Sequence, residues 1–300
     1  MRLPLDRREF CRSSLASLTV LGLGGAQFPP PPRPEKLDLA ARLSMTPPEG
    51  SLEERFALLR DAGFAGVELD HSDAIDAREV KDASAATGLA VHGLREADAL
   101  DHPLTSDDPN VRAHGREVLE RALRLCKAVG GSGVGLLPGQ VTPEISYARA
   151  WNHARVELRA MAPLAESLGL RIGLKNGPNR FLLSPLEAAR FVDELASPVF
   201  GWHLDVAWSL ALSWPQHWIH VLGARLLKVD LRDFSRAASE STGFSRGFDV
   251  ALGQGDCQWE ALLEALAHAR YNGWVTTDVP GGDAQRLGTV ARTATELLGR

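Results

Sequence analysis

The chain has 300 residues, of which 44% are hydrophobic, and a formal net charge of −5. This composition is typical of a soluble globular protein with a large core. No basic stripe interleaved with aromatic residues is present, which argues against nucleic acid as a partner. The cysteines Cys11, Cys126 and Cys257 show no CxxC spacing, so neither a zinc site nor a disulfide framework is expected.

The N-terminal segment carries the pattern of a targeting signal. Arg7 and Arg8 stand in DRREF, and an apolar run, Leu15–Leu23, follows. The pattern resembles a twin-arginine export signal, and its apolar run is too short to span a membrane as a helix. A disordered basic tail is the alternative, but it leaves the apolar run unexplained. We therefore predict a signal peptide over 1–26, a proline-rich linker over 27–36 and a periplasmic location, with no membrane span elsewhere.

From Leu37 onward, strand and helix patterns alternate. The expected strands are Leu37–Ser44, Gly66–Asp70, Leu89–Leu94, Gly133–Leu137, Leu170–Lys175, Val199–Val206, Arg225–Asp233 and Gly273–Val279. The expected helices are Leu52–Ala62, Ala77–Thr87, Val111–Val129, Ala148–Leu168, Pro185–Leu195, Pro215–Leu222, Trp259–Ala269 and Ala284–Leu298. Eight βα units predict a single-domain α/β fold over 37–300, the (β/α)₈ or TIM barrel. An open doubly wound sheet would need a glycine-rich turn after its first strand, which LSMTPPEG does not supply.

Alternation along the strands predicts which side chains point into the barrel. In RLLKVDLRD the apolar face holds Leu227, Val229 and Leu231, and the opposite face holds Lys228, Asp230 and Arg232. The same rule turns an ionisable residue inward on five other strands: Glu68, His92, Lys175, the pair His203 and Asp205, and Asp278. Active sites of such barrels form at the carboxyl ends of several strands.

Each inward residue has an ordinary explanation when it is taken alone. A strand-end Asp or Lys can cap a loop, His92 can be a hydrogen-bonded core histidine, and Glu68 can be an ion-pair partner. The whole set is harder to explain in this way, because interior charges need partners or water and these residues are expected to converge on one mouth. The set therefore predicts a binding or catalytic mouth.

Several motifs resemble the sugar isomerase and epimerase family with a xylose-isomerase-like barrel. They are GFAGVELD, NRFLLSP, GWHLDV, KVDLRDF, ALGQGDCQWEALLEAL and YNGWVTTDVPGGD, and they span nearly all of the chain after the linker. The resemblance implies one divalent ion, Mn²⁺ or Mg²⁺, held by a Glu, Asp, His, Glu set from strands five to eight. It also implies that the two glutamates move a proton beside a carbonyl while the cation stabilises the enediolate.

This sequence departs from that family pattern at three of the four ligand positions. Lys175 replaces the first glutamate, Asp230 replaces the histidine and Asp278 replaces the last glutamate, whereas Asp205 matches. A charged ammonium cannot bind a metal, so the hypothesis is that Lys175 takes the place of the cation among three carboxylates. No cofactor is expected from the residues themselves. A divalent metal is expected only if the family site is retained, with Asp205 and Asp230 as its ligands.

Three functional hypotheses follow from these departures. The first is an isomerase or epimerase acting on a sugar or a related hydroxy-carbonyl compound, with Lys175 as base or electrostatic clamp and Asp278 as acid and base. In this hypothesis the substrate contacts are Glu68, His92, His203 and Arg232. The second is a non-catalytic sugar-binding protein that has lost the metal site. The third, a metal-dependent nuclease, lacks the necessary His and Glu ligands. A small-molecule sugar or polyol derivative is the expected partner, and a homo-oligomer is left open.

Overall fold

The computed structural model describes residues 33–71, 75–96 and 99–299. The predicted signal peptide over 1–26 and most of the predicted linker lie outside these residues. Within the described residues, no helix is both long and apolar enough to cross a membrane.

Eight parallel strands close into a barrel in the order of the sequence, which confirms the predicted fold. The strands are β1 (Leu37–Arg42), β2 (Gly66–His71), β3 (Ala90–Glu96), β4 (Gly133–Leu136), β5 (Arg171–Lys175), β6 (Phe200–Asp205), β7 (Leu226–Leu231) and β8 (Gly273–Thr277). Pairing of β1 with β8 completes the closure, with Leu37 opposite Gly273. The buried apolar side chains pack between this barrel and its helices.

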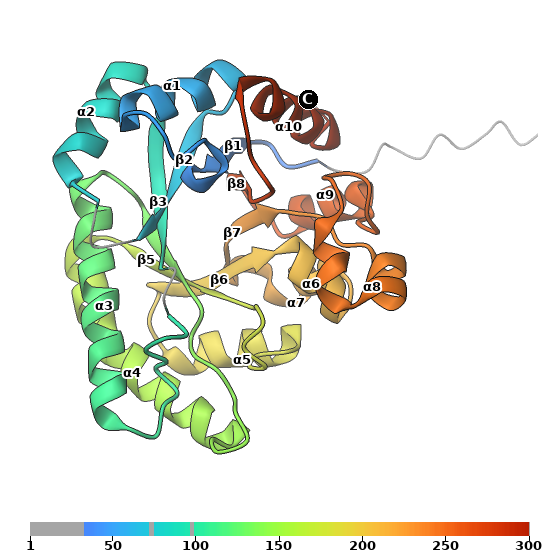
Figure 1. The fold of residues 1–300 in the computed structure, drawn as a ribbon. Helices are drawn as coiled ribbons and strands as arrows, with labels where there is room; N and C mark the ends of the chain where they lie inside the picture. Colours follow the sequence, from blue (N-terminus) through green and yellow to red (C-terminus); the bar gives the residue numbers. More distant parts are fainter. Residues whose placement is uncertain (1–32, 72–74, 97–98, 300) are drawn as a thin grey trace, which may run out of the picture. The chain divides into compact units, whose positions relative to one another are not determined.

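The helices lie outside the strands, as Figure 1 shows for α1 to α5. They are α1 (Leu52–Ala62), α2 (Ala77–Thr87), α3 (Pro109–Ala128), α4 (Tyr147–Leu168), α5 (Pro185–Leu195), α6 (Val206–Leu212), α7 (Pro215–Leu222), α8 (Arg236–Thr242), α9 (Trp259–His268) and α10 (Ala284–Leu297). Short 3₁₀ turns are η1 (Leu43–Met45), η2 (Gly223–Arg225) and η3 (Phe244–Asp249). The sequence patterns did not predict α6 and α8, which follow β6 and β7 on the side of the barrel where the strands end.

The segment NRFLLSP fixes the path from β5 to α5. Ser184 accepts a hydrogen bond from the backbone N–H of Glu187, whose carboxylate accepts one from the backbone N–H of Ser184, so the two form a capping box. Pro185 occupies the first turn, where a missing N–H costs nothing. This start holds the loop that follows Lys175 in place.

One prediction about strand faces is wrong. The pairing of β6 with β7 shifts between Trp202 and His203, so His203 lies opposite Lys228. Leu227 falls at this irregularity, and its side chain lines the barrel interior instead of facing the helices. The inward position of Gly201 makes room for it, because a Cβ there would lie 2.4 Å from Leu227 Cγ.

Candidate functional site

Asp230 is the buried centre of the charged residues inside the barrel. Its Oδ1 lies 2.7 Å from His203 Nε2, and its Oδ2 accepts a hydrogen bond from Arg42 Nη2 at 3.0 Å. Lys175 Nζ donates to the same Oδ2. Strand pairing explains part of this arrangement, because Lys175 lies opposite His203 and Asp205 lies opposite Asp230. Both oxygens of Asp230 are therefore occupied by protein donors.

Arg42, at the end of β1, is a site residue that the sequence interpretation missed. Its side chain is 1% exposed, and its Nη1 donates to Asp70 at 3.2 Å. Its Nε lies 3.0 Å from Asp278 Oδ1, although this N–H is not aligned for a hydrogen bond. Its Nη2 also lies 3.6 Å from Glu68 Oε2, so Arg42 joins four carboxylates, two from β2, one from β7 and one from the end of β8. Strand alternation along LDLAAR does predict that Arg42 points into the barrel. The other residues on that face of β1 gave no sign of a functional site, so Arg42 was not selected.

A second ion pair lies deeper in the barrel, between Lys228 Nζ and Glu68 Oε1. Glu68 Oε2 and His203 Nδ1 are buried and have no hydrogen-bond partner among the described residues. Both atoms belong to residues that line an inner cavity of about 110 Å³, together with His92 and Trp274. His92 is stacked on Trp274 with ring centroids 4.8 Å apart, and its Nε2 lies 3.2 Å from Thr276 Oγ1.

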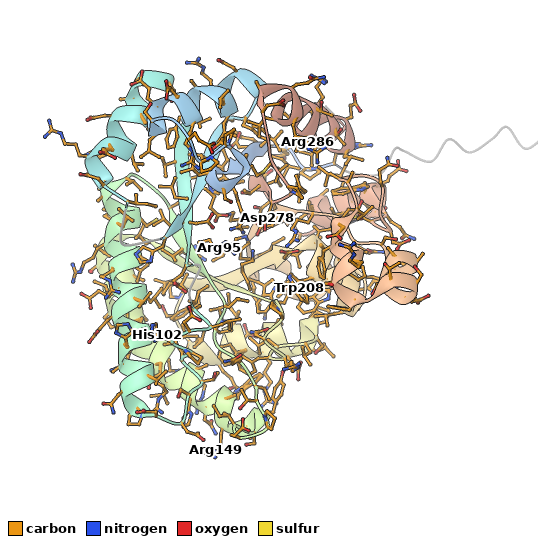
Figure 2. The ribbon with its side chains drawn as sticks, viewed as in Figure 1. Arg95, His102, Arg149, Trp208, Asp278 and Arg286 are labelled. Carbon is orange, nitrogen blue, oxygen red and sulfur yellow. The ribbon has the colours of Figure 1, made fainter. Side chains whose placement is uncertain are left out.

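A separate cavity of about 90 Å³ lies at the carboxyl ends of the strands, which is the mouth of the barrel. It is lined by Arg95, Glu96, Leu137, Lys175, Asn176, Gly177, Pro178, Asp205, Trp208, Arg232 and Asp278. Figure 2 shows the labelled Arg95, Trp208 and Asp278 around the centre of the view. The amide of Asn176 is 1% exposed, and neither its oxygen nor its nitrogen has a partner among the described residues. A buried amide of this kind can bind a hydroxyl group that enters the mouth.

The carboxyl groups of Asp205 and Asp230 differ in electrostatics although their strands are neighbours. Burial raises the pKa of Asp205, and Arg232 and Lys175 only partly oppose this effect. Burial would also raise the pKa of Asp230, but His203, Lys175 and Arg42 outweigh it and hold that pKa well below its usual value. Asp205 therefore accepts a proton more readily than Asp230 does.

The buried basic groups are also perturbed. Burial lowers the pKa of both His92 and His203 to about 3, so both rings are neutral near pH 7. Because His203 Nε2 faces a carboxylate oxygen, that nitrogen carries the proton and Nδ1 is an acceptor. Burial lowers the pKa of Lys228, and the charge of Glu68 partly offsets the shift.

The acidic residues of the mouth lie close enough together to suggest a metal site. One carboxylate oxygen each from Asp205, Asp230 and Asp278 lie within 4.8 Å of one another. These oxygens already face protein cations and donors, however, since Lys175 and Arg42 contact Asp230 and the backbone N–H of Trp208 donates to Asp205 at 3.1 Å. A divalent ion would have to displace an ammonium or a guanidinium group from a buried carboxylate. These three carboxylates therefore do not fit a resident divalent ion.

The predicted site residues separate into two groups. Lys175, Asp205, Arg232 and Asp278 line the mouth, while Asp230 lies beneath it at 0% exposure. Glu68, His92 and His203 line the inner cavity instead. The expectation that all of these residues converge on one mouth is wrong, because Glu68, His92 and His203 come earlier along their strands. Their role as substrate contacts stays a prediction.

The tryptophans of β6 and of the segment after it also separate into core and mouth residues. Trp202 and Trp218 are fully buried and stack on each other with centroids 5.7 Å apart, so they belong to the core. Trp214 packs against the guanidinium of Arg236 at 3.9 Å. Trp208 is the member of the cluster that lines the mouth.

The family model for the xylose isomerase-like TIM barrel matches residues 56–298. The chain belongs to this family. The chain matches none of the curated proteins.

Solved structures of sugar epimerases share the fold. A D-allulose 3-epimerase from Methylomonas sp. in complex with D-allulose is 21% identical, with a TM-score of 0.71 over 90% of this chain and 99% of that one. A 3-keto-D-glucoside 4-epimerase from E. coli is 18% identical, with a TM-score of 0.74 over 88% and 100%. An L-ribulose 3-epimerase is 20% identical, with a TM-score of 0.73 over 88% and 93%. At these identities the likeness is one of fold.

Proposed function

We propose that the protein is of the sugar isomerase or epimerase type and moves a proton on a small hydroxy-carbonyl compound in its mouth without a metal ion. The observation that carries this proposal is the composition of the mouth cavity, where the carboxyl groups of Asp205 and Asp278 face Lys175 and Arg232. The unpartnered amide of Asn176 adds a site for a substrate hydroxyl. The named activities of the epimerases that share the fold favour the same substrate class.

The proposed chemistry uses the chain's own charges. A mouth carboxylate, Asp278 in its predicted role, takes a proton from the carbon next to the carbonyl, and the electron pair moves to the carbonyl oxygen to form an enediolate. Lys175 and Arg232 stabilise the negative oxygen as fixed cations. The protonated carboxyl group then gives this proton to the former carbonyl carbon, while the hydroxyl proton on the first carbon passes to the enediolate oxygen, so that the carbonyl and hydroxyl groups exchange places. Lys175 fits the role of clamp better than that of base, since its ammonium is paired with Asp230 and lies 3.9 Å from Asp205.

The separation of the carboxyl groups bears on the type of reaction. Two bases acting on opposite faces of one carbon need oxygens about 6 to 7 Å apart, because each must approach within about 3 to 3.5 Å. Carboxylate oxygens of Asp205 and Asp278 lie within 4.8 Å of each other. This spacing favours proton transfer on one face of the substrate, between adjacent carbons, as in aldose and ketose interconversion.

Solvent exchange tests the proposal. Protein treated with EDTA is incubated in D₂O with D-fructose and with L-ribulose, and loss of carbon-bound hydrogen is followed by NMR. We expect deuterium incorporation by the wild type and a loss of about 10²- to 10⁴-fold in Asp278→Asn. Asp61→Asn, a change at an exposed carboxylate on α1, is the matched control and should keep the wild-type rate. No incorporation by the wild type with these ketoses or with a glycosylated ketose such as lactulose, or a rate unchanged in Asp278→Asn, would refute this function.

The second candidate is a non-catalytic sugar-binding protein. The saturation of Asp230 by three protein donors favours it, because such a network resembles a fixed structural element. Sugar binding in calorimetry without any deuterium incorporation would support this candidate. For either candidate we also propose export to the periplasm. Secretion of a reporter fused to residues 1–36, with loss of secretion when Arg7 and Arg8 are changed to Lys, would test that proposal.

A further inference from the structure

An aromatic cluster adjoins the mouth on the side of α6. The ring of Trp208, which lines the mouth cavity, lies 4.7 Å from the ring of Phe248 and 5.9 Å from that of Phe244, measured between centroids. Phe234 packs against Phe248 with centroids 4.8 Å apart. We call these four residues the aromatic rim. Figure 1 shows α8, which precedes two of them in the chain, beside α6.

The exposure of Phe244 is not explained by folding. Phe244 is 52% exposed, and among the exposed large hydrophobic residues of the described chain it is the aromatic one. The helix before it, α8, has no buried residue, so the segment that carries Phe244 contributes little to the core. An aromatic ring held against its neighbours with half of its surface in water is available to a ligand.

Arg232 connects the rim to the charged mouth. Its guanidinium carbon lies 5.3 Å from the centroid of Phe248, within the range of a cation–π contact. Its Nη1 lies 3.7 Å from Asp205 and 3.8 Å from Asp278. A molecule bound in the mouth therefore contacts Trp208 and Arg232, and these two residues touch the other rings of the aromatic rim.

We propose that the aromatic rim binds the non-reacting sugar ring of a larger substrate, so that the substrate class is a glycosylated hydroxy-ketone instead of a free monosaccharide. This inference rests on the proposed function, since it extends the same site. The mouth offers charges and an amide, which suit a carbonyl and its hydroxyl groups. The rim offers flat apolar surface, which suits the C–H face of a pyranose ring.

The surroundings of Phe244 argue against a protein partner. The exposed residues next to it in sequence are polar or small: Glu240, Ser241, Thr242, Gly243, Ser245, Arg246 and Asp249. A stable protein interface buries about 800 Å² on each side around an apolar centre, far more than one ring supplies. One sugar ring is small enough to be covered by the rim.

Matched ketoses test the inference. Isothermal titration is carried out on the full chain with D-fructose and with lactulose, which is fructose that carries a galactose ring. We expect lactulose to bind about tenfold more tightly than fructose. In Phe244→Ala the ratio of the two dissociation constants should fall toward 1, and Phe244→Leu should retain part of it. Leu186→Ala, which removes a 71% exposed side chain on α5, should keep the wild-type ratio.

The contrary outcomes are distinct from those of the proton-exchange test. Equal affinities for the two ketoses in the wild type, no binding of lactulose, or an unchanged ratio in Phe244→Ala would each overturn the inference. These readouts need no turnover, so a catalytically inactive sugar-binding protein could still show the preference. Deuterium incorporation with equal affinities for both ketoses would keep the proposed function and reject the glycosylated substrate.

Discussion

Asp230 and Asp278 lie a few ångströms apart, but their surroundings differ. Asp230 is fully buried, and three protein donors occupy its oxygens. Asp278 is 25% exposed, lines the mouth cavity and is held by Arg42 and Arg232. A carboxylate whose oxygens are all bonded to protein donors can stabilise the fold but has no oxygen free for a ligand. A carboxylate that is ion-paired and also lines a cavity can act on a ligand. We therefore interpret the inner part of the network as structural, and the proposed function assigns the chemistry to the outer part.

The largest expected loss of stability comes from a substitution of Asp230, in the inner part of the network. Asp230→Asn removes the charge that compensates Lys175 and Arg42 in a buried setting, so we expect the free energy of unfolding to fall by about 3 to 5 kcal/mol. Asp278→Asn leaves Arg42 with Asp230 and Asp70, and its cost should be about 1 kcal/mol or less. Urea denaturation of the two variants measures both values. Equal losses would contradict the division into an inner and an outer part.

The pH dependence of stability tests whether the two buried histidines of the inner part are neutral in the folded protein. Burial holds the pKa of His92 and of His203 at about 3 in the folded protein, against about 6.5 in the unfolded chain. Between these two values the unfolded chain binds more protons, so stability falls as the pH drops below 6.5. Each histidine contributes up to about 1.4 kcal/mol per pH unit in this window.

Denaturation midpoints at pH 7 and pH 5 measure this slope. His92→Gln should reduce it, because His92 lies in the inner cavity and bonds only weakly to Thr276. His268→Gln, a change at an exposed histidine on α9, is the control and should leave the slope unchanged. A His92→Gln slope equal to that of the wild type would show that His92 is not held neutral by burial.

A steric effect smaller than that of Asp230→Asn concerns the glycine that accommodates His203. A Cβ at Gly135 would lie 2.6 Å from His203 Nδ1, so Gly135→Ala must displace the ring that contacts Asp230. We expect a cost of about 1 to 3 kcal/mol, as for other overpacked sites. Gly288→Ala on α10 is the matched control, because its Cβ meets a flexible arginine at 3.5 Å and should be neutral or stabilising. Thermal unfolding of both variants measures these changes in stability, and an unchanged stability of Gly135→Ala would contradict the predicted displacement of His203.

Much of the barrel could be predicted from the sequence because its signals are local. The apolar periodicity placed eight strands, the glycines at 63 and 169 end helices in the left-handed conformation, and the capping box of Ser184 and Glu187 starts α5. Strand alternation correctly turned Lys175, Asp205 and Asp230 inward. These features depend on neighbours a few residues away, which a single sequence displays.

The contents of the site depend on closure of the barrel, which no local pattern records. Arg42 reaches Asp230 across 188 residues of sequence, and Lys228 reaches Glu68 across 160. The irregular pairing at Trp202 turned Leu227 inward against simple alternation. The position of a residue along its strand determines whether its side chain lines the mouth or the inner cavity. His92 was predicted to lie at the mouth because strand alternation does not give this position.

In the proposed site, protein cations hold the carboxylates to which a divalent ion would otherwise bind. Isothermal titration of Mn²⁺ into the EDTA-treated, dialysed wild type tests it most directly, with Lys175→Met as the companion variant. We expect no binding by the wild type at concentrations up to about 1 mM, and measurable binding once the ammonium is removed. Tight binding of one Mn²⁺ by the wild type, lost in Asp205→Asn, would contradict the claim.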